Sequence, residues 1–122
     1  MEDPKFSIRS RIRSFGFAIA GMRQFLIREH NARIHLAATV AVTVLACWVK
    51  VSRGEAGALV AAVALVWITE MLNTCVERMA DLVTRSAHPE IKIIKDLAAA
   101  AVLVAAIAAV ITGCIIFIPK FL

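Results

Sequence analysis

The chain has few charged residues, no tyrosine and no glycine-rich loop that could hold a phosphate. Only 19% of its 122 residues are charged and 61% are apolar, a composition that lies outside that of soluble domains and indicates a membrane protein. A Walker A sequence is also absent, so nucleotide binding cannot be inferred from a known soluble phosphate-loop fold. The composition favours a single all-α integral membrane domain covering residues 1–122.

Cysteine and histidine are scarce, and neither type of residue is clustered. The cysteines stand singly in apolar runs, without the paired spacing of a zinc site or a redox couple: Cys47, Cys75 and Cys114. The histidines are equally dispersed: His30, His35 and His88. A metal site built from imidazoles is therefore disfavoured, and we expect the histidines to have ordinary roles at helix ends.

A cleavable secretory signal is not expected. Residues 1–33 contain seven lysines and arginines, but they lack the uninterrupted apolar core and small-residue cleavage site of a signal peptide. We therefore expect the N-terminal segment to remain in the mature protein.

Three runs without acidic residues, lysine or arginine predict membrane spans. They are residues 34–49, 56–69 and 97–119, and with their flanks they predict helices at 33–51, 55–83 and 92–120. The last run is long enough for a hydrocarbon core of about 30 Å, whereas the first is shorter than the usual ~20 residues. The first span is expected to extend through Arg33 and Lys50, whose charged ends can snorkel to the membrane surface.

The N-terminal segment predicts an amphipathic surface helix over about residues 7–30. Its apolar residues recur at helical spacing: Ile12, Phe15, Ile19, Met22 and Leu26. Its other faces carry several arginines that would meet anionic headgroups, so we expect the helix to lie flat on the membrane. Gly16 and Gly21 each cost about 1 kcal/mol of helix propensity relative to alanine, which predicts a break or bend.

The distribution of basic residues predicts the topology. Seven of the fourteen precede the first span and three more lie between residues 84 and 95. The positive-inside rule then places the N-terminus and the second connection in the cytoplasm. The basic side chains are expected to face membrane lipid rather than nucleic acid. The connection at 52–55 would face outward, and His88-Pro89 marks a break before the last helix.

Four polar residues follow the second apolar run and form what we call the polar stripe: Glu70, Asn73, Glu77 and Asp81. At 100° per residue they fall within roughly 80° of the helix circumference. Ionisable groups at membrane depth are costly and indicate a functional site by default. Since residues 56–69 rise only about 21 Å as a helix, Glu70 is expected near the inner hydrocarbon boundary, with the later members nearer water.

The polar stripe has the side chains needed for phosphoryl transfer. Glu70 and Glu77 lie one above the other on a helix, and Glu29, expected at about the depth of the cytosolic end of this helix, could complete a divalent cation site with them. Mg²⁺ takes one or two carboxylates plus waters and substrate phosphates. Lys95 and Asp96 start the third predicted span, where basic groups could bind a polyphosphate. Two alternatives are non-enzymatic oligomers. In one the stripe joins helices through hydrogen bonds, and in the other it carries protons or ions. A pore would need polar lining across the bilayer, and residues 56–69 offer only Thr69.

A wider set of residues forms one pattern along nearly the whole chain. It comprises Ser14-Phe15 with Ala18 and Gly21; Glu29 through His35; Glu70-Met71-Leu72-Asn73-Thr74 with Glu77 and Asp81-Leu82-Val83; and Lys95-Asp96 with Ala98, Ala99 and Ala101-Val102-Leu103. In this pattern the chain resembles the prokaryotic diacylglycerol kinase family, which includes undecaprenol kinases. The E-x-x-N-x-x-x-E-x-x-x-D run is its most discriminating part.

The resemblance implies a homotrimer of three-span subunits in the cytoplasmic (inner) membrane, with sites shared between subunits on the cytosolic side. Glu70 would be the general base for the lipid hydroxyl that attacks the γ-phosphorus of ATP, and Asn73 would orient the site. Glu29 and Glu77 would hold Mg²⁺. The nucleotide would meet Phe17, Glu29, Glu77, Asp81, His88, Lys95 and Asp96. The lipid would meet Ser14, Glu70 and Ala99.

Three positions depart from the family pattern. Ser86-Ala87-His88 replaces a turn that often contains tyrosine, Phe17 stands where tyrosine is common, and Ala100 replaces a frequent glycine. The segments at 29–35 and at His88-Pro89 look more like the undecaprenol kinase branch. The resemblance therefore favours undecaprenol over diacylglycerol as the substrate, although both offer a hydroxyl at the interface.

Overall fold

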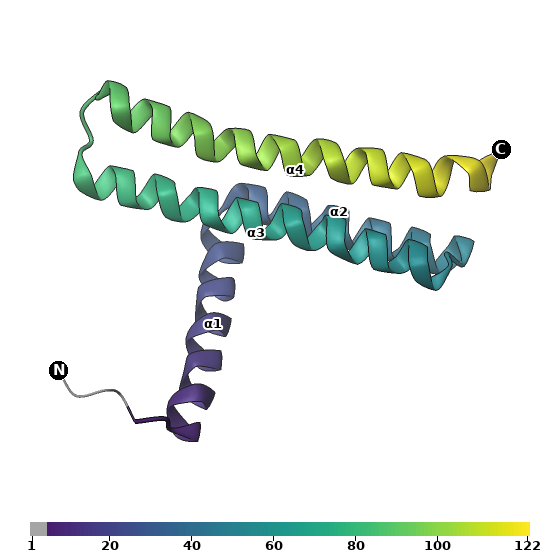
Figure 1. Cartoon of the computed structure of the whole chain (residues 1–122), viewed down its shortest axis with the longest axis horizontal. Coiled ribbons are helices and arrows are strands. Elements are labelled where there is room, and N and C mark those ends of the chain that lie inside the picture. Colours follow the sequence, from purple (N-terminus) through teal and green to yellow (C-terminus); the bar gives the residue numbers. More distant parts are fainter. Residues whose placement is uncertain (1–4) are drawn as a thin grey trace.

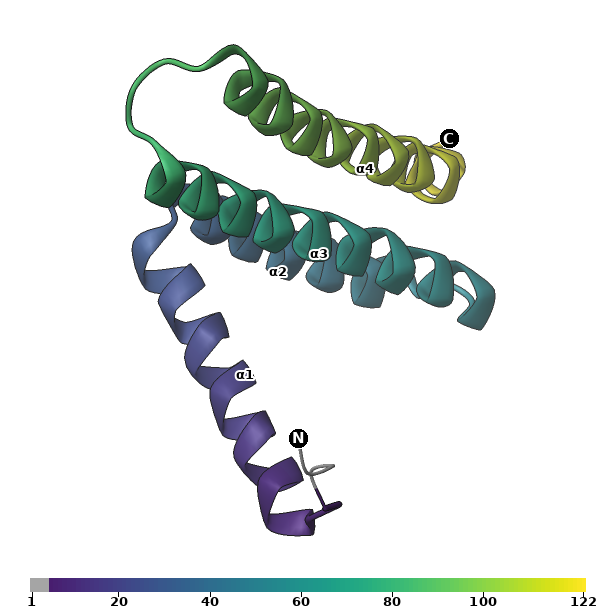
Figure 2. The same cartoon turned by 60° about the vertical axis from the view of Figure 1, so that its left-hand side comes forward.

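A computed structural model describes residues 5–122 as four α-helices (Figure 1). The helices are α1 (Ile8–Arg28), α2 (His30–Val49), α3 (Arg53–Val83) and α4 (Pro89–Phe121). Helices α2, α3 and α4 are long and apolar enough to cross a membrane, which confirms the all-helical class and the three predicted spans. The three helices run roughly parallel, and α1 projects from the start of α2, where α3 and α4 extend further toward the turn that joins them (Figures 1 and 2).

Local sequence explains where the helices begin. The Ser52 hydroxyl accepts from the Glu55 backbone N–H, and the Glu55 carboxylate accepts from the Ser52 N–H, so a capping box starts α3. His88 caps α4 by accepting the Glu90 N–H at 3.2 Å through Nδ1, and Pro89 occupies the first turn. For that reason α4 begins at Pro89 and not at the predicted residue 92.

The junction between α1 and α2 is a single residue, Glu29, in extended conformation. Arg33 donates to the carbonyl oxygens of Leu26 at 3.3 Å and Ile27 at 2.8 Å. These bonds satisfy carbonyls in the last turn of α1, which lack partners within the helix. Arg33 is therefore bound to backbone at the corner and does not form a helical ion pair with Glu29.

Helix α1 runs without interruption from Ile8 to Arg28, so the break predicted at Gly16 and Gly21 was wrong. Apart from the local backbone of α1 and the adjoining residues, no atom lies within 4 Å of where a Cβ would stand at either glycine. The apolar residues of the helix remain largely uncovered: Ile12 is 67% exposed and Phe15 72% exposed. Only Phe25, near the bundle, is buried. These apolar side chains of α1 thus have no covering partner within residues 5–122.

The bundle has a narrow core and broad apolar outer faces. Its buried apolar residues are spread along the helices: Phe25, Ala32, Leu59, Val66, Ala80, Ala105 and Ile116. Large apolar side chains such as Val60, at 69%, and Val104, at 67%, remain exposed. A surface of this kind suits lipid or other copies of the chain rather than water. The three cysteines are exposed.

Candidate active site

The polar stripe passes from buried to exposed along α3. Glu70 is only 6% exposed and is the one buried polar or charged residue in the described part of the chain. At the other end, the Asp81 side chain is 60% exposed. The stripe therefore joins a protected carboxylate to a water-accessible one over three helical turns.

Glu70 is held by a histidine from another helix. His35 Nε2 of α2 lies 2.8 Å from Glu70 Oε1, and the two side chains are 22% and 8% exposed. The expected helix-end role of His35 was wrong, because its ring crosses to α3 from the second turn of α2. A signal existed in the sequence: His35 is the one histidine in the run 34–49, which has no acidic residue, lysine or arginine.

A second polar link lies next to this pair. Trp67 Nε1 of α3 donates to Thr39 Oγ1 of α2 at 2.9 Å, and Thr39 Oγ1 donates to the His35 carbonyl oxygen at 2.7 Å. The Trp67 ring also packs edge-on against Phe25 of α1, with ring centroids 6.1 Å apart. These contacts join α1, α2 and α3 around Glu70, and sequence periodicity alone did not identify them.

The predicted metal ligands lie on two segments that meet at this end of the bundle. Glu29 Oε1, at the corner between α1 and α2, accepts from Arg78 of α3 at 3.1 Å. Glu77 Oε1 accepts a long hydrogen bond of 3.5 Å from Asn73 Nδ2. No cluster of three or more His, Cys, Asp or Glu side chains suited to a metal occurs among residues 5–122. Glu29 thus lies against Arg78, which is next to Glu77 in the sequence.

The oxygens present fit a cation that needs few protein ligands. Asn73 Oδ1 is buried and has no hydrogen-bond partner among the described residues, although buried acceptors are normally satisfied. Carboxylate and amide oxygens are hard ligands, and Mg²⁺ usually takes only one or two carboxylates. Asn73, Glu77 and Glu29 therefore carry oxygens of the chemical type that magnesium prefers.

A recess lies beyond the exposed end of the stripe, at the turn between α3 and α4. Its volume is about 780 Å³, within the range of small-molecule sites. Lys95 Nζ lies 3.2 Å from Asp81 Oδ1, and Lys92 pairs with Asp96. The lining combines basic, acidic and hydroxyl groups: Asp81, Thr84, Arg85, Ser86, Ala87, His88, Pro89, Ile91, Lys92, Lys95 and Asp96.

Three predicted site residues are exposed and lie on α1 and α4. The Ser14 hydroxyl donates to the Ser10 carbonyl oxygen of its own helix at 3.0 Å. Phe17 is 69% exposed on α1, and Ala99 is exposed on α4, one turn after Lys95, which pairs with Asp81. The Ser14 hydroxyl thus bonds within its own helix, while Phe17 and Ala99 have no polar side-chain atoms.

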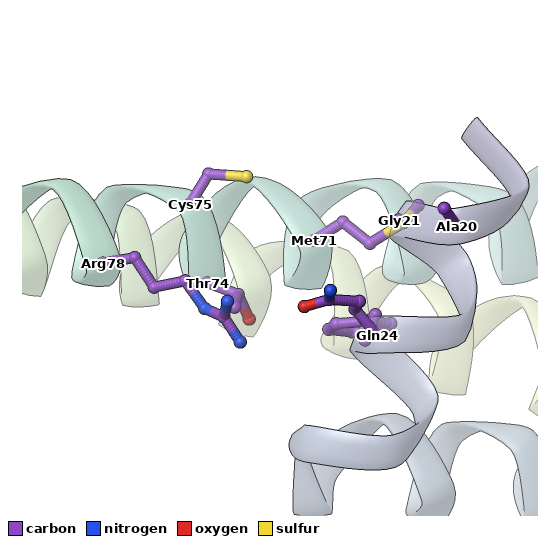
Figure 3. Close-up of a pocket in the computed structure, with 8 residues that line it drawn as sticks. Ala20, Gly21, Gln24, Met71, Thr74, Cys75 and Arg78 are labelled. Atoms are coloured by element: carbon purple, nitrogen blue, oxygen red, sulfur yellow. The ribbon is translucent and has the colours of Figure 1, made fainter. Parts of the chain in front are cut away.

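A second cavity, which the sequence did not predict, lies between α1 and α3 (Figure 3). It has a volume of about 350 Å³. The Gln24 amide and the Arg78 guanidinium point into the same gap below α3 (Figure 3). The remaining lining is mostly apolar: Ala20, Gly21, Phe25, Met71, Thr74 and Cys75. Met71 follows Glu70 in sequence, so this cavity adjoins the buried end of the stripe.

The model of the prokaryotic diacylglycerol kinase family matches residues 16–117. The chain belongs to this family. A diacylglycerol kinase of Synechocystis sp. is 42% identical over 110 residues, which are 89% of this chain and 63% of that relative. A diacylglycerol kinase of Escherichia coli K12 is 36% identical over 90% of each chain. An undecaprenol kinase of Bacillus subtilis 168 is 34% identical over 98% of this chain and 97% of the relative.

These relatives confirm the predicted family and place the chain among lipid kinases. The chain spans less than two thirds of the length of the Synechocystis relative but nearly all of the length of the other two. The two diacylglycerol kinases are 42% and 36% identical to the chain, and the undecaprenol kinase is 34% identical over a larger share of it. Overall similarity therefore does not separate the two substrates.

Proposed function

We propose that this chain is an ATP- and Mg²⁺-dependent membrane lipid kinase that phosphorylates a lipid hydroxyl, with undecaprenol favoured over diacylglycerol. The observation that carries the proposal is the polar stripe, which begins at a buried carboxylate and ends beside a polar recess. A lipid can reach the buried end from the membrane, and a nucleotide can reach the exposed end from water. Family membership supports the same chemistry.

In this proposal Glu70 is the catalytic base. Its carboxylate takes the proton of the lipid hydroxyl as the hydroxyl oxygen forms a bond to the γ-phosphorus of ATP. The bond from that phosphorus to the β–γ bridging oxygen breaks, and ADP leaves with the electron pair. A base of this kind typically contributes 10²–10⁴-fold to the rate. The rest of the catalysis comes from positioning and charge neutralisation.

The residues at the middle of the stripe would hold the metal. Glu77 and Glu29 supply carboxylates, and Asn73 supplies the amide oxygen that lacks a partner. When bound there, Mg²⁺ would neutralise the charge of the transferred phosphoryl group. Arg78, which contacts Glu29, adds a positive charge beside the same carboxylates.

The nucleotide would occupy the recess at the α3–α4 turn. Lys95 is placed to meet phosphate oxygens, while Asp81 and Asp96 each hold a lysine in place. His88 stands at the start of α4 and lines the recess. Phe17 has a ring that could pack on adenine, which requires α1 of this or another copy to approach the recess.

The exposed apolar faces support a membrane-bound homotrimer with sites shared between subunits. The apolar face of α1 would enter the membrane surface while its arginines meet anionic headgroups. Ser14 and Ala99 would contact the lipid in such an assembly. The excess of basic residues at the N-terminus and at the α3–α4 turn supports a cytosolic site in the inner membrane.

Undecaprenol is favoured because the segment from Glu29 to His35 and the His88-Pro89 pair resemble the undecaprenol kinase branch. The structure adds that His35 of this segment contacts Glu70, so a feature of that branch reaches the proposed base. Apolar chains by themselves discriminate weakly between tails, which makes residues near the hydroxyl the better guide.

Transfer of labelled γ-phosphate from ATP tests the proposal. Undecaprenol and diacylglycerol are presented separately in one micelle system, each with Mg²⁺ and with a chelator. We expect label on both lipids, more on undecaprenol, and none when Mg²⁺ is removed. Labelling of neither lipid would contradict kinase activity and would favour the alternative of a non-enzymatic oligomer joined by the stripe.

A further inference from the structure

The kinase proposal gives no role to His35, although His35 contacts the proposed base, Glu70. We propose that His35 is a positioning residue that fixes the Glu70 carboxylate, so that its second oxygen faces the lipid hydroxyl. This inference rests on the proposed function, because it gives Glu70 its role as the base. It adds a residue that the family resemblance did not assign to the site.

The geometry is that of a single, directed hydrogen bond. Nε2 of His35 lies 2.8 Å from Oε1 of Glu70, within the range of a strong N–H···O bond. A base must be ionised to take a proton, and an ionised carboxylate only accepts, so the proposed role of Glu70 requires Nε2 of His35 to donate. None of the hydrogen bonds found within residues 5–122 involves Oε2 of Glu70. One carboxylate oxygen is thus held and the other remains open to a substrate hydroxyl.

Both partners are mounted on rigid elements. His35 lies in the second turn of α2 and Glu70 in the middle of α3, away from the helix ends. Thr39 accepts from Trp67 at 2.9 Å and donates to the His35 carbonyl at 2.7 Å, which joins the two helices one turn from the pair. Catalytic geometry on supported helices is more accurate than geometry on loops.

Fixing the Glu70 carboxylate should raise kcat by a measurable factor. Without a partner, a glutamate side chain samples several rotamers, and few of them aim an oxygen at the hydroxyl. A misplacement of about 1 Å can cost about 10²-fold in rate. Loss of His35 should therefore lower kcat, whereas ATP, which binds at the other end of the stripe, should keep its KM.

Three substitutions of His35 separate positioning from a general need for a polar side chain. His35→Leu removes the donor, and we expect kcat to fall about 10- to 100-fold with an unchanged KM for ATP. His35→Gln places an amide N–H the same number of bonds from Cβ as Nε2, so it should restore most of kcat. His35→Asn carries the same amide one bond closer to the backbone and should behave like the leucine variant.

The matched control is Thr43→Val on the same helix. The Thr43 hydroxyl bonds only to the Thr39 carbonyl of its own helix in the described structure, so its removal should leave kcat unchanged. Wild-type kcat in His35→Leu, or equal kcat in the Gln and Asn variants, would overturn the positioning role. If the leucine variant does not fold, the Gln and Asn variants decide the matter. A wild-type protein that labels no lipid would instead overturn the kinase proposal itself.

Discussion

Both ends of α3 carry a lysine–carboxylate pair formed with α4, and the two pairs have different surroundings. At the outer end in the proposed topology, Lys120 Nζ lies 3.0 Å from Glu55 Oε2. At the α3–α4 turn, Lys95 Nζ lies 3.2 Å from Asp81 Oδ1. The ends lie on opposite sides of the bundle (Figure 1). The two ion pairs have similar charges and distances, so the two ends of α3 can be compared within one molecule.

The Glu55 end is complete as a structural cap. Glu55 accepts from the Ser52 backbone at 2.8 Å as well as from Lys120, and Trp48 packs near Phe121 with ring centroids 6.1 Å apart. The Asp81 end instead leads toward Glu77, the unpartnered Asn73 amide oxygen and buried Glu70. The comparison teaches that similar ion pairs can have different surroundings: a closed helix cap at one end of α3, and the polar groups of the proposed site at the other.

The largest expected effect follows from changing Glu70 to glutamine. Glu70→Gln keeps the size of the side chain but removes the base, so lipid phosphorylation should fall at least about 10²-fold. Glu55→Gln is the matched change at the other end of α3 and should leave kcat unchanged. Turnover near that of wild type in the Glu70 variant would show that another group takes the proton.

The next effect concerns the proposed metal ligands. Glu77→Gln and Glu29→Gln each remove one negative ligand, and we expect the Mg²⁺ concentration for half-maximal rate to rise at least about 10-fold. The measurement is a magnesium titration of lipid phosphorylation at saturating ATP. An unchanged magnesium requirement in both variants would place the metal elsewhere.

A smaller effect is expected from the two matched lysines. Lys95→Met should raise the KM for ATP by about 10-fold, because a hydrogen bond to a charged group contributes about 1.5–3 kcal/mol. Lys120→Met breaks the equivalent pair at the other end and should leave this KM unchanged. Steady-state kinetics with varied ATP make the comparison, and equal KM values for the two variants would remove the distinction between the ends.

The smallest effect on turnover is expected at the α3 cap. Ser52→Ala removes the hydroxyl that accepts from Glu55 N–H at 3.2 Å, which should lower the free energy of unfolding by about 1 kcal/mol. Phosphorylation by the folded protein should be unchanged. Denaturant unfolding in micelles measures the first effect, and a loss of kcat at unchanged stability would contradict a purely structural role.

Much of the fold could be predicted because its signals are local. The runs without acidic residues, lysine or arginine predict the spans, and His88-Pro89 predicts the break before α4. The spacing of the polar stripe likewise follows from helical period alone. Gly16 and Gly21 misled the prediction of a break in α1, since the cost of about 1 kcal/mol per glycine is small beside the backbone hydrogen bonds of a 21-residue helix.

The contacts across helices could not be predicted, because they depend on the rotation and register of packed helices. His35 was expected at a helix end, yet it meets Glu70 from 35 residues away. Arg78 lies beside the stripe in sequence, but its contact with Glu29 spans 49 residues. Sequence pattern predicts which residues carry the chemistry, and only the assembled bundle shows which side chains contact them.

The sidedness of the reaction tests the central claim most directly, namely that one end of the bundle is a site and the other a cap. The protein is reconstituted into vesicles in one known orientation with lipid substrate in both leaflets, and labelled ATP with Mg²⁺ is added to one side at a time. We predict labelled lipid only when ATP is on the side of the α3–α4 turn. Labelling only when ATP is on the side of Glu55 and Lys120, or no labelling from either side, would contradict the account.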